Sequence, residues 1–303
     1  MSGLAVSAST PRYFNLAALV ATVLFWGFNW PVVKILLATN SPWSLRAAGL
    51  TGGALFLVLA TRLCGESLSV PRAHWRDVVV AGILNVAIFN ICTVFAQLTM
   101  PTSRAAILTF TMPLWTTIFA WKLLGEPIDR RRIAALTVGV IGLSLLAVPF
   151  WPVIVAGGVP FGLLYVLGAA ISWALGTVYL KGHPIAAAPL AVTAWQVIIS
   201  AVICIVCLLL FETPHLDLSG TPQLLAFIYH VTLPQGMAYI LWFGLVRRVP
   251  ASTAALGTLL VPVFGVVGSV LLLGDWPTQL DLIGLGLIIA AVMLDQFRAS
   301  PRR

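Results

Sequence analysis

The segment PTSRAAILTFTMPLWTTIFAWKLLG (residues 101–125) recurs in the second half of the chain as PASTAALGTLLVPVFGVVGSVLLLG (residues 250–274). Nine of the twenty-five aligned positions are identical, and the alignment needs no gap. At a similar offset, Trp26 and Lys34 correspond to Trp173 and Lys181. The chain is therefore an internal duplication. In a membrane protein, such a duplication predicts a binding site between the two halves.

The composition indicates that the chain lies in a lipid bilayer. Hydrophobic residues make up 60% of it and charged residues only 9%, whereas soluble domains carry about 25% charged residues. Apolar runs of about twenty residues, long enough to cross the hydrocarbon core, recur along the whole length. We predict an all-α integral membrane protein with ten transmembrane helices, at about residues 14–36, 43–63, 78–98, 103–124, 132–150, 160–180, 188–211, 223–246, 251–273 and 280–298.

The boundary between the two halves falls in a Pro/Gly-containing stretch, residues 150–159. We therefore divide the chain into a first five-helix repeat, residues 1–150, and a second, residues 151–303. Because five is odd, the second repeat enters the membrane from the opposite side. The two repeats are thus predicted to be inverted relative to each other.

The charged residues predict the orientation in the membrane. If the N-terminus is cytoplasmic, the external side receives only Lys34, Arg46 and Arg104 of the 17 lysines and arginines, and the cytoplasmic side receives the other fourteen. This bias follows the positive-inside rule, so we expect both termini in the cytoplasm and the protein as a multi-pass component of a bacterial inner (plasma) membrane. The net charge of +8 is then expected to orient the protein in the membrane and to bind anionic lipid headgroups, and not to bind nucleic acid.

Prolines interrupt the predicted helices near mid-depth. Pro113 and Pro262 are equivalent in the two repeats, and Pro234 is equivalent to Asn85. An interior proline removes a backbone hydrogen bond and kinks the helix. Interruptions at matching places point to a central site, so we predict that Pro113, Pro234 and Pro262 act as kinks or gates. The alternative is a set of kinks that packing alone compensates.

Polar and aromatic side chains at mid-depth are the candidate site. Amide groups in hydrocarbon need hydrogen-bond partners, so they should face protein or water. Asn90 and Thr93 are equivalent in the repeat to Tyr239 and Trp242, so we expect these two stripes to face each other. Interhelical hydrogen bonding is the alternative. The predicted substrate-binding residues are Trp26, Asn29, Asn85, Asn90, Thr93, Trp173, Tyr179, His230, Gln235, Tyr239 and Trp242.

The acidic residues argue against an enzyme. All nine lie in loops or at segment ends, and no spacing of His, Cys, Asp or Glu suggests a metal site or a catalytic set, so we expect no cofactor. A charge in the membrane is costly and is retained where function needs it. The cavity should therefore be nearly neutral, with His230 as the one titratable group able to carry protons. Lys34 and Arg104 either meet a substrate carboxylate or reach the headgroups.

The quoted segments resemble the drug/metabolite transporter superfamily and, within it, the EamA-type ten-helix exporters. The resemblance rests on Trp26-Gly27-Phe28-Asn29, on Leu124-Gly125-Glu126-Pro127 with Pro113, and on their second-half counterparts. Length and tryptophan content are most similar to the YddG-type amino-acid exporters. The resemblance implies a basket of ten helices, a cavity lined by helices 1, 3, 4, 6, 8 and 9, and efflux of small metabolites.

The sequence thus predicts an inner-membrane exporter of small metabolites. We expect amino acids, including aromatic ones, to move by alternating access around a neutral midplane cavity and by facilitated diffusion. The alternatives are export of other small neutral metabolites or drugs with exchange or proton coupling, and a non-transporting or lipid-handling membrane protein. The expected partners are a small-molecule substrate and the lipid bilayer, and the expected assembly is a monomer or a weak homodimer.

Overall fold

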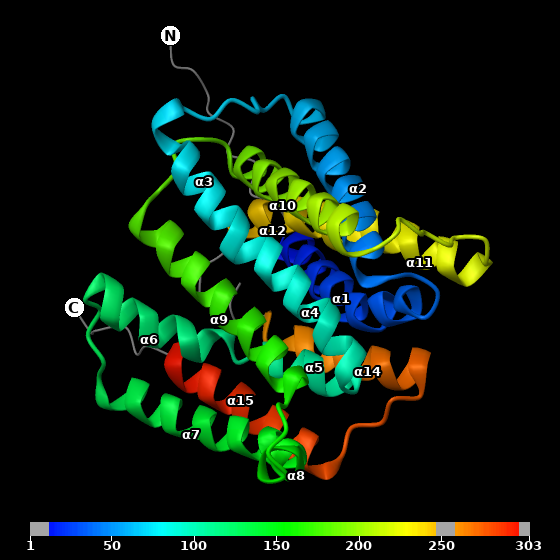
Figure 1. The fold of residues 1–303 in the computed structure, drawn as a ribbon. Helices are drawn as coiled ribbons and strands as arrows, with labels where there is room; N and C mark the ends of the chain where they lie inside the picture. Colours follow the sequence, from blue (N-terminus) through cyan, green and yellow to red (C-terminus); the bar gives the residue numbers. More distant parts are fainter. Residues whose placement is uncertain (1–11, 247–257, 297–303) are drawn as a thin grey trace.

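The computed structural model describes residues 12–246 and 258–296, and the regular structure within them is entirely helical (Figure 1). The first half contains α1 (Arg12–Leu37), α2 (Pro42–Leu63), η1 (Arg72–His74), α3 (Trp75–Ala81), η2 (Gly82–Ile88), α4 (Phe89–Thr99), α5 (Thr102–Thr109), α6 (Met112–Leu124), α7 (Arg130–Ala147) and η3 (Val148–Phe150), and the short α8 (Trp151–Val155) follows directly after it. The second half contains α9 (Phe161–Gly182), α10 (Pro189–Phe211), α11 (Thr221–Thr232), η4 (Leu233–Met237), α12 (Ala238–Val246), α14 (Leu260–Leu273) and α15 (Gln279–Gln296).

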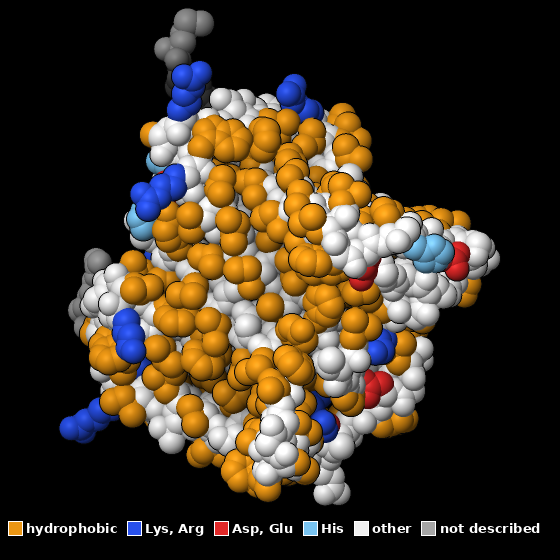
Figure 2. Space-filling model, in the orientation of Figure 1, with side chains coloured by type: hydrophobic (Ala, Val, Ile, Leu, Met, Phe, Trp, Pro, Cys, Tyr) orange, Lys and Arg blue, Asp and Glu red, His pale blue; other side chains and the backbone are white. Residues whose placement is uncertain are grey.

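The prediction of an all-helical membrane protein is confirmed. Within the described residues, eight helical stretches are long and apolar enough to span a bilayer, and α14 is a shorter apolar helix. Hydrophobic side chains cover most of the face in Figure 2, and lysines and arginines lie mainly at its margins. The number of ten spans stays a prediction.

Local sequence explains where several helices begin and end. Ser41 accepts a hydrogen bond from the backbone of Ser44 at the start of α2, and Asp129 does the same for Arg132 at the start of α7. Gly125 and Gly274 end α6 and α14 in the left-handed conformation, with φ of 68° and 66°. These two glycines are equivalent in the repeat, so the shared Leu-Leu-Gly motif ends the same helix in each half.

The helices pack in pairs that the duplication relates. The fifth predicted span, α7, packs against the tenth, α15, at one edge of the bundle, and the second span, α2, packs against the seventh, α10, at another (Figure 1). The contact of α1 with α14 is matched by that of α9 with α6, its counterpart after exchange of the repeats. Each half thus buries its apolar surface mainly against the other half.

Small residues allow the closest of these contacts. The α-carbon of Gly139 lies against Leu114, and those of Gly142 and Gly284 lie in the contact between α7 and α15. A side chain at Gly284 would meet the fully buried Leu146. Glycine here lets two helix backbones approach closely, which is how helices associate in lipid.

Interruptions of the helices also follow the duplication. The third span contains the π-helical turn η2, and the eighth contains the π-helical turn η4, which includes Pro234. The fourth span breaks at Phe110 and Thr111, and Pro113 then occupies the first turn of α6. Pro262 likewise occupies the first turn of α14. In a first turn the missing N–H of proline has no intrahelical partner to lose, so Pro113 and Pro262 begin helices and do not kink continuous ones.

Candidate functional site

A cavity of about 520 Å³ lies between the two repeats. Its volume is in the range of small-molecule binding pockets, roughly 300–1,000 Å³. Helices from both halves line it, so it depends on the two repeats together. The lining includes Trp26, Asn29, Trp30, Val33, Arg46, Phe89, Asn90, Thr93, Gln97, Phe110, Met112, Pro113, Thr116, Thr117, Trp173, Thr177, Pro234, Gln235, Tyr239, Trp242, Thr258, Leu259, Val261, Val292 and Asp295.

Aromatic rings form two groups on the cavity wall. Trp26 of α1 contacts Tyr239 and Trp242 of α12, with ring centroids 5.9 and 5.6 Å apart. Phe89 of α4 contacts Trp173 of α9 at 4.9 Å. Each group joins one helix of the first repeat to one helix of the second. Together they offer flat apolar surfaces to a ligand side chain.

The polar part of the wall lies on α4. Asn90 donates its amide to the carbonyl of Val86 at 2.9 Å, and Thr93 donates its hydroxyl to the carbonyl of Asn90 at 3.1 Å. Gln97 lies one turn beyond Thr93 on the same face, and its Oε1 is buried without a hydrogen-bond partner. A buried amide oxygen without a partner is costly, so Gln97 is prepared to accept a hydrogen bond from a ligand.

The sequence predicted a nearly neutral cavity without charges at mid-depth, but two charged side chains of opposite sign, Arg46 and Asp295, line it. The side chain of Arg46 is buried and donates to Thr93 Oγ1 at 3.1 Å. An arginine inside the hydrocarbon region costs about 2.5–3.5 kcal/mol on insertion scales. Arg46 was assigned to the external side of the membrane because it lies only one turn into its helix. The fold turns that side chain inward.

The structure places most of the predicted site residues on the cavity wall. They are Trp26, Asn29, Asn90, Thr93, Trp173, Gln235, Tyr239 and Trp242, with Pro113 and Pro234 of the three prolines. The equivalent stripes of α4 and α12 therefore face one space, as the duplication predicted.

The other predicted residues do not line the cavity. His230 is fully buried, and its Nδ1 lies 2.7 Å from Asn29 Oδ1. Asn85 packs against Gly176 of α9, Tyr179 donates its hydroxyl to Asp77 at 2.7 Å, and Pro262 is buried in α14. None of these four is among the residues that line the described cavity.

Lys34 and Arg104, which were expected to meet a substrate carboxylate or the lipid headgroups, both bond to protein groups. Arg104 makes a two-point ion pair with Asp281 of α15, at 2.7 and 3.0 Å, with both side chains buried. Lys34 donates to the backbone carbonyl of Gln97. Arg104 therefore neither reaches the headgroups nor stands free for a ligand. Its pairing joins the two repeats at the end of the bundle where α5 begins.

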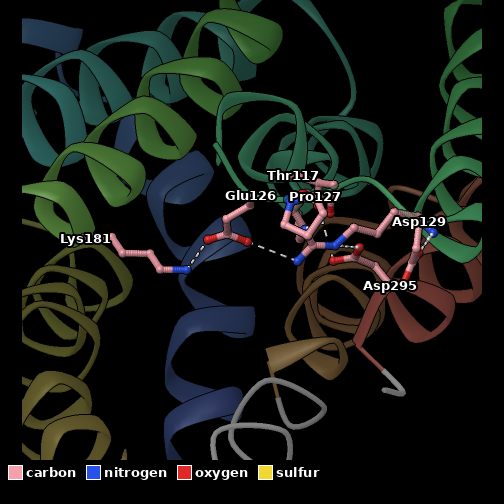
Figure 3. Close-up of polar contacts among 8 residues, drawn as sticks. Thr117, Glu126, Pro127, Asp129, Lys181 and Asp295 are labelled. Atoms are coloured by element: carbon pink, nitrogen blue, oxygen red, sulfur yellow. Dashed lines mark hydrogen bonds and ion pairs between the residues drawn. The ribbon is translucent and has the colours of Figure 1, made fainter. Parts of the chain in front are cut away.

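A second ionic group joins the repeats at the opposite end. Glu126 lies between Lys181 of α9 and Arg132 of α7, and Arg132 also approaches Asp295, with Nε–Oδ1 at 3.6 Å (Figure 3). Asp295 accepts a hydrogen bond from Thr117 at 3.2 Å. The hydrogen bond from Lys181, with a second from Arg132, holds the pKa of the Glu126 carboxyl below its usual value. We call Glu126, Arg132, Lys181 and Asp295 the ionic cluster.

The site contains few groups for chemistry on a ligand. No group of three or more His, Cys, Asp or Glu side chains that could hold a metal ion occurs among the residues for which the structure gives positions. The cavity offers hydrogen bonds, a guanidinium, a carboxylate and aromatic surfaces, which are means of binding.

Comparisons with known proteins agree with this architecture. The model of the EamA-like transporter family matches the chain twice, over residues 14–148 and 160–294. A "Probable amino-acid metabolite efflux pump" of Salmonella typhimurium is 26% identical, over 95% of this chain and 96% of its own length. The "Uncharacterized transporter YvbV" of Bacillus subtilis is also 26% identical, over 97% and 95%.

Two further proteins extend the comparison. A "Probable terminal-alkyne amino-acid exporter" of Streptantibioticus cattleyicolor is 25% identical, over 94% of each chain. A solved crystal structure shares the fold, with a TM-score of 0.66 at 22% identity over 94% of this chain and 97% of that one. With two copies of the family repeat across most of its length, this multi-pass membrane protein belongs to the EamA-like transporter family.

Proposed function

We propose that this protein exports small metabolites across the inner membrane of a bacterium, and that amino acids, including aromatic ones, are its substrates. The observation that carries the proposal is the central cavity, which helices of both repeats line with aromatic rings and hydrogen-bonding side chains. A pocket of this size and lining suits a small solute that has one apolar and one polar end. The names of two relatives, an amino-acid metabolite efflux pump and an amino-acid exporter, support the substrate class.

The transport cycle we propose is alternating access. Residues 1–150 and 151–303 form two inverted five-span modules that rock about the cavity. The paired contacts between the repeats support this division, as do the π-helical turns at equivalent places. The helix break before Pro113 and the turn at Pro234 supply points at which the cavity wall can bend.

We propose facilitated diffusion as the driving mechanism. The one histidine predicted to carry protons, His230, lies behind the cavity wall with its Nδ1 on Asn29. In this scheme flux follows the substrate gradient alone. Exchange and proton coupling through His230 remain the alternatives that the experiment must separate.

Efflux from proteoliposomes tests the function. Liposomes loaded with a panel of radiolabelled amino acids should release one or more of them in a saturable, protein-dependent way. An imposed pH gradient should leave the initial rate unchanged. Absence of saturable flux for every amino acid would refute the substrate class. A rate that follows the pH gradient in the wild type but not in His230→Gln would establish coupling instead.

A further inference from the structure

Arg46 differs from the other charged side chains within the bundle. It lies one turn into α2, it is only 3% exposed, and it lines the cavity. Arg104, which is comparably buried, has a carboxylate partner in Asp281. Arg132 has Glu126 and Asp295. For Arg46, the described part of the chain supplies no carboxylate within ion-pair distance.

The hydrogen bonds of Arg46 are also incomplete. A guanidinium has five N–H donors in a fixed plane. In the described structure one of them, on Nη2, donates to Thr93 Oγ1, and the Nε–H is buried without a partner. The hydroxyl hydrogen of Thr93 already points to the carbonyl of Asn90. Thr93 therefore holds one corner of the guanidinium and leaves the other donors for something that enters the cavity.

Asp295 does not fill this role. The start of α2 follows directly on the end of α1, and α1 ends beside Met100, Leu273 and Asp275, where α14 ends and α15 is about to begin. Asp295 lies almost at the other end of α15, beside Thr117 and Arg132. Asp281 and Asp295 are fourteen positions apart in α15, which corresponds to about 21 Å along the helix. Arg46 and Asp295 therefore occupy different ends of the cavity.

We propose that Arg46 binds the carboxylate of the transported solute, and hence that the substrates are carboxylates, with amino acids among them. This inference rests on the proposed function and names the polar contact that the cavity makes. A carboxylate matches the planar donors of a guanidinium and can accept two hydrogen bonds at once. An anion there also replaces the missing counter-charge of a buried cation.

The neighbouring groups complete the recognition of an amino acid. Gln97 lies one turn from Thr93 on α4, and its unpartnered Oε1 accepts the hydrogen bond of an ammonium group. The rings of Trp26, Tyr239 and Trp242 line the same cavity and receive the apolar side chain. Arg46 thus selects for the carboxylate, while the aromatic wall selects for the side chain.

The wild-type protein gives the first test, through efflux of two matched solutes from proteoliposomes. At about pH 6, well below the α-amino pKa of roughly 7.7–8.0, phenylalanine and phenylalaninamide share the ring and the ammonium group but differ in the carboxylate. We expect the kcat/KM of efflux to be about 10- to 100-fold higher for phenylalanine, the range of a charge-assisted two-point contact. Equal efflux of the two solutes would overturn the role of Arg46 and leave the exporter function standing.

Three variants assign the discrimination to the side chain. Arg46→Gln removes the charge, and we expect it to lower phenylalanine efflux to the level of the amide while amide efflux stays within about twofold of the wild type. Arg46→Lys keeps the charge but loses the planar donors, so we expect an intermediate value. Arg62→Gln makes the same change in the exposed last turn of the same helix and should leave both rates unchanged.

The outcomes separate the two proposals. If Arg46→Gln lowers both solutes equally, the residue is structural and the inference is wrong. If wild-type protein releases the amide but not phenylalanine, transport stands and the carboxylate class fails. If the wild type releases neither these nor any amino acid of the panel, the proposed substrate class fails and the inference fails with it. Should Arg46→Gln not fold, the wild-type comparison and Arg46→Lys still decide.

Discussion

At the scale of single residues, the chain handles its buried ions in two ways. Arg104 and Asp281 neutralise each other with two hydrogen bonds, and Thr278 donates two more to Asp281 from its backbone and hydroxyl. Arg46 has a hydroxyl partner and no carboxylate among the described residues. The first arrangement is complete without a ligand, whereas the second is complete only with an anion. This difference separates a structural arginine from a ligand-binding one.

The buried pair predicts a specific pattern of stabilities. Asp281→Asn leaves the charge of Arg104 buried without compensation, and we expect a loss of about 3–5 kcal/mol of stability. The double variant Arg104→Met with Asp281→Leu removes both charges and should regain most of that loss, because paired apolar side chains need no counter-charge. Thermal unfolding of the detergent-purified protein, followed by intrinsic fluorescence, measures both.

A double variant as unstable as Asp281→Asn alone would contradict this account. It would mean that the bonds of Asp281 to Thr278 at the start of α15, not the ion pair, carry the stabilisation.

At the scale of elements, the interruptions of the helices are as informative as the helices. The π-helical turns η2 and η4 lie at equivalent places in the two repeats, although one contains Pro234 and the other contains no proline. The shared turn therefore does not depend on proline alone. It carries the backbone past the cavity, with Asn85 behind the wall in one repeat and Gln235 on the wall in the other. Turns of this kind are frequent at functional sites.

The contact between α7 and α15 predicts that two glycines of α15, Gly284 and Gly286, differ in how much stability is lost when each is replaced by alanine. Gly284→Ala places a methyl group against the buried Leu146, and we expect a loss of about 1–3 kcal/mol from overpacking. Gly286→Ala meets nothing within 4 Å, so it should be neutral or slightly stabilising because alanine favours the helix. The same unfolding measurement compares the two. Equal effects would show that the helices do not pack as closely as the structure describes.

At the scale of the whole molecule, two groups of charges join the repeats at opposite ends of the cavity. The Arg104–Asp281 pair ties α5 to α15 at one end, and the ionic cluster ties the loop between α6 and α7 to α9 and α15 at the other (Figure 3). For the cavity to open toward one side, the contacts at that side have to separate. The more exposed ionic cluster is the weaker of the two, because water screens its charges.

The ionic cluster predicts a change in access to the cavity. Glu126→Gln leaves Lys181 and Arg132 without their shared carboxylate, so we expect this end of the bundle to open more often. Maleimide labelling of a cysteine introduced at the partly buried cavity residue Thr116, in a background without the native cysteines, measures the access. The labelling rate should rise about two- to fivefold, the effect of a surface ion pair.

A control variant and the pH dependence of labelling test whether the change is specific to Glu126. Asp217→Asn makes the same chemical change in the loop between α10 and α11, where Asp217 bonds to Ser219, and it should not alter labelling. Because the pKa of Glu126 is lowered, its contacts are fully present above the ordinary carboxyl pKa of about 4.3 and are lost only as the pH falls through the lowered value. Once thiol ionisation is corrected for, wild-type labelling should therefore be flat from pH 6 to 8. A rate that climbs across that range would contradict the role of Glu126.

Much of the fold was predictable because it depends on local composition and on duplication. The apolar runs indicated the helical stretches, and the nine shared identities indicated two repeats that pack on each other. The Leu-Leu-Gly motif also predicts a helix end, because glycine enters the left-handed conformation at less cost than other residues. The break before Pro113 was read as a kink because sequence does not say whether a helix continues on the other side of a proline.

The site was predictable where polarity alone identifies a residue, and not where orientation does. Polar and amphipathic groups at mid-depth are unfavourable in contact with lipid, so they face the cavity or other parts of the protein. Those that face the cavity include Asn90, Thr93, Tyr239 and Trp242. Asn85 and His230 satisfy the same rule by packing or bonding to protein away from the cavity, and Tyr179 satisfies it by donating to Asp77.

The sequence by itself determined that the chain is a helical membrane protein built from two related halves. A bilayer favours helices for apolar segments of this length, and the repeat is visible as shared identities between residues 101–125 and 250–274. Only the tertiary structure decided which polar side chains face the cavity, and that Arg46 is among them while Arg104 is neutralised. The physical reason is that the role of a buried charge depends on which groups lie next to it in space. The partner of Arg104 lies 177 residues away in the chain, at Asp281, and only the packed bundle brings the two together.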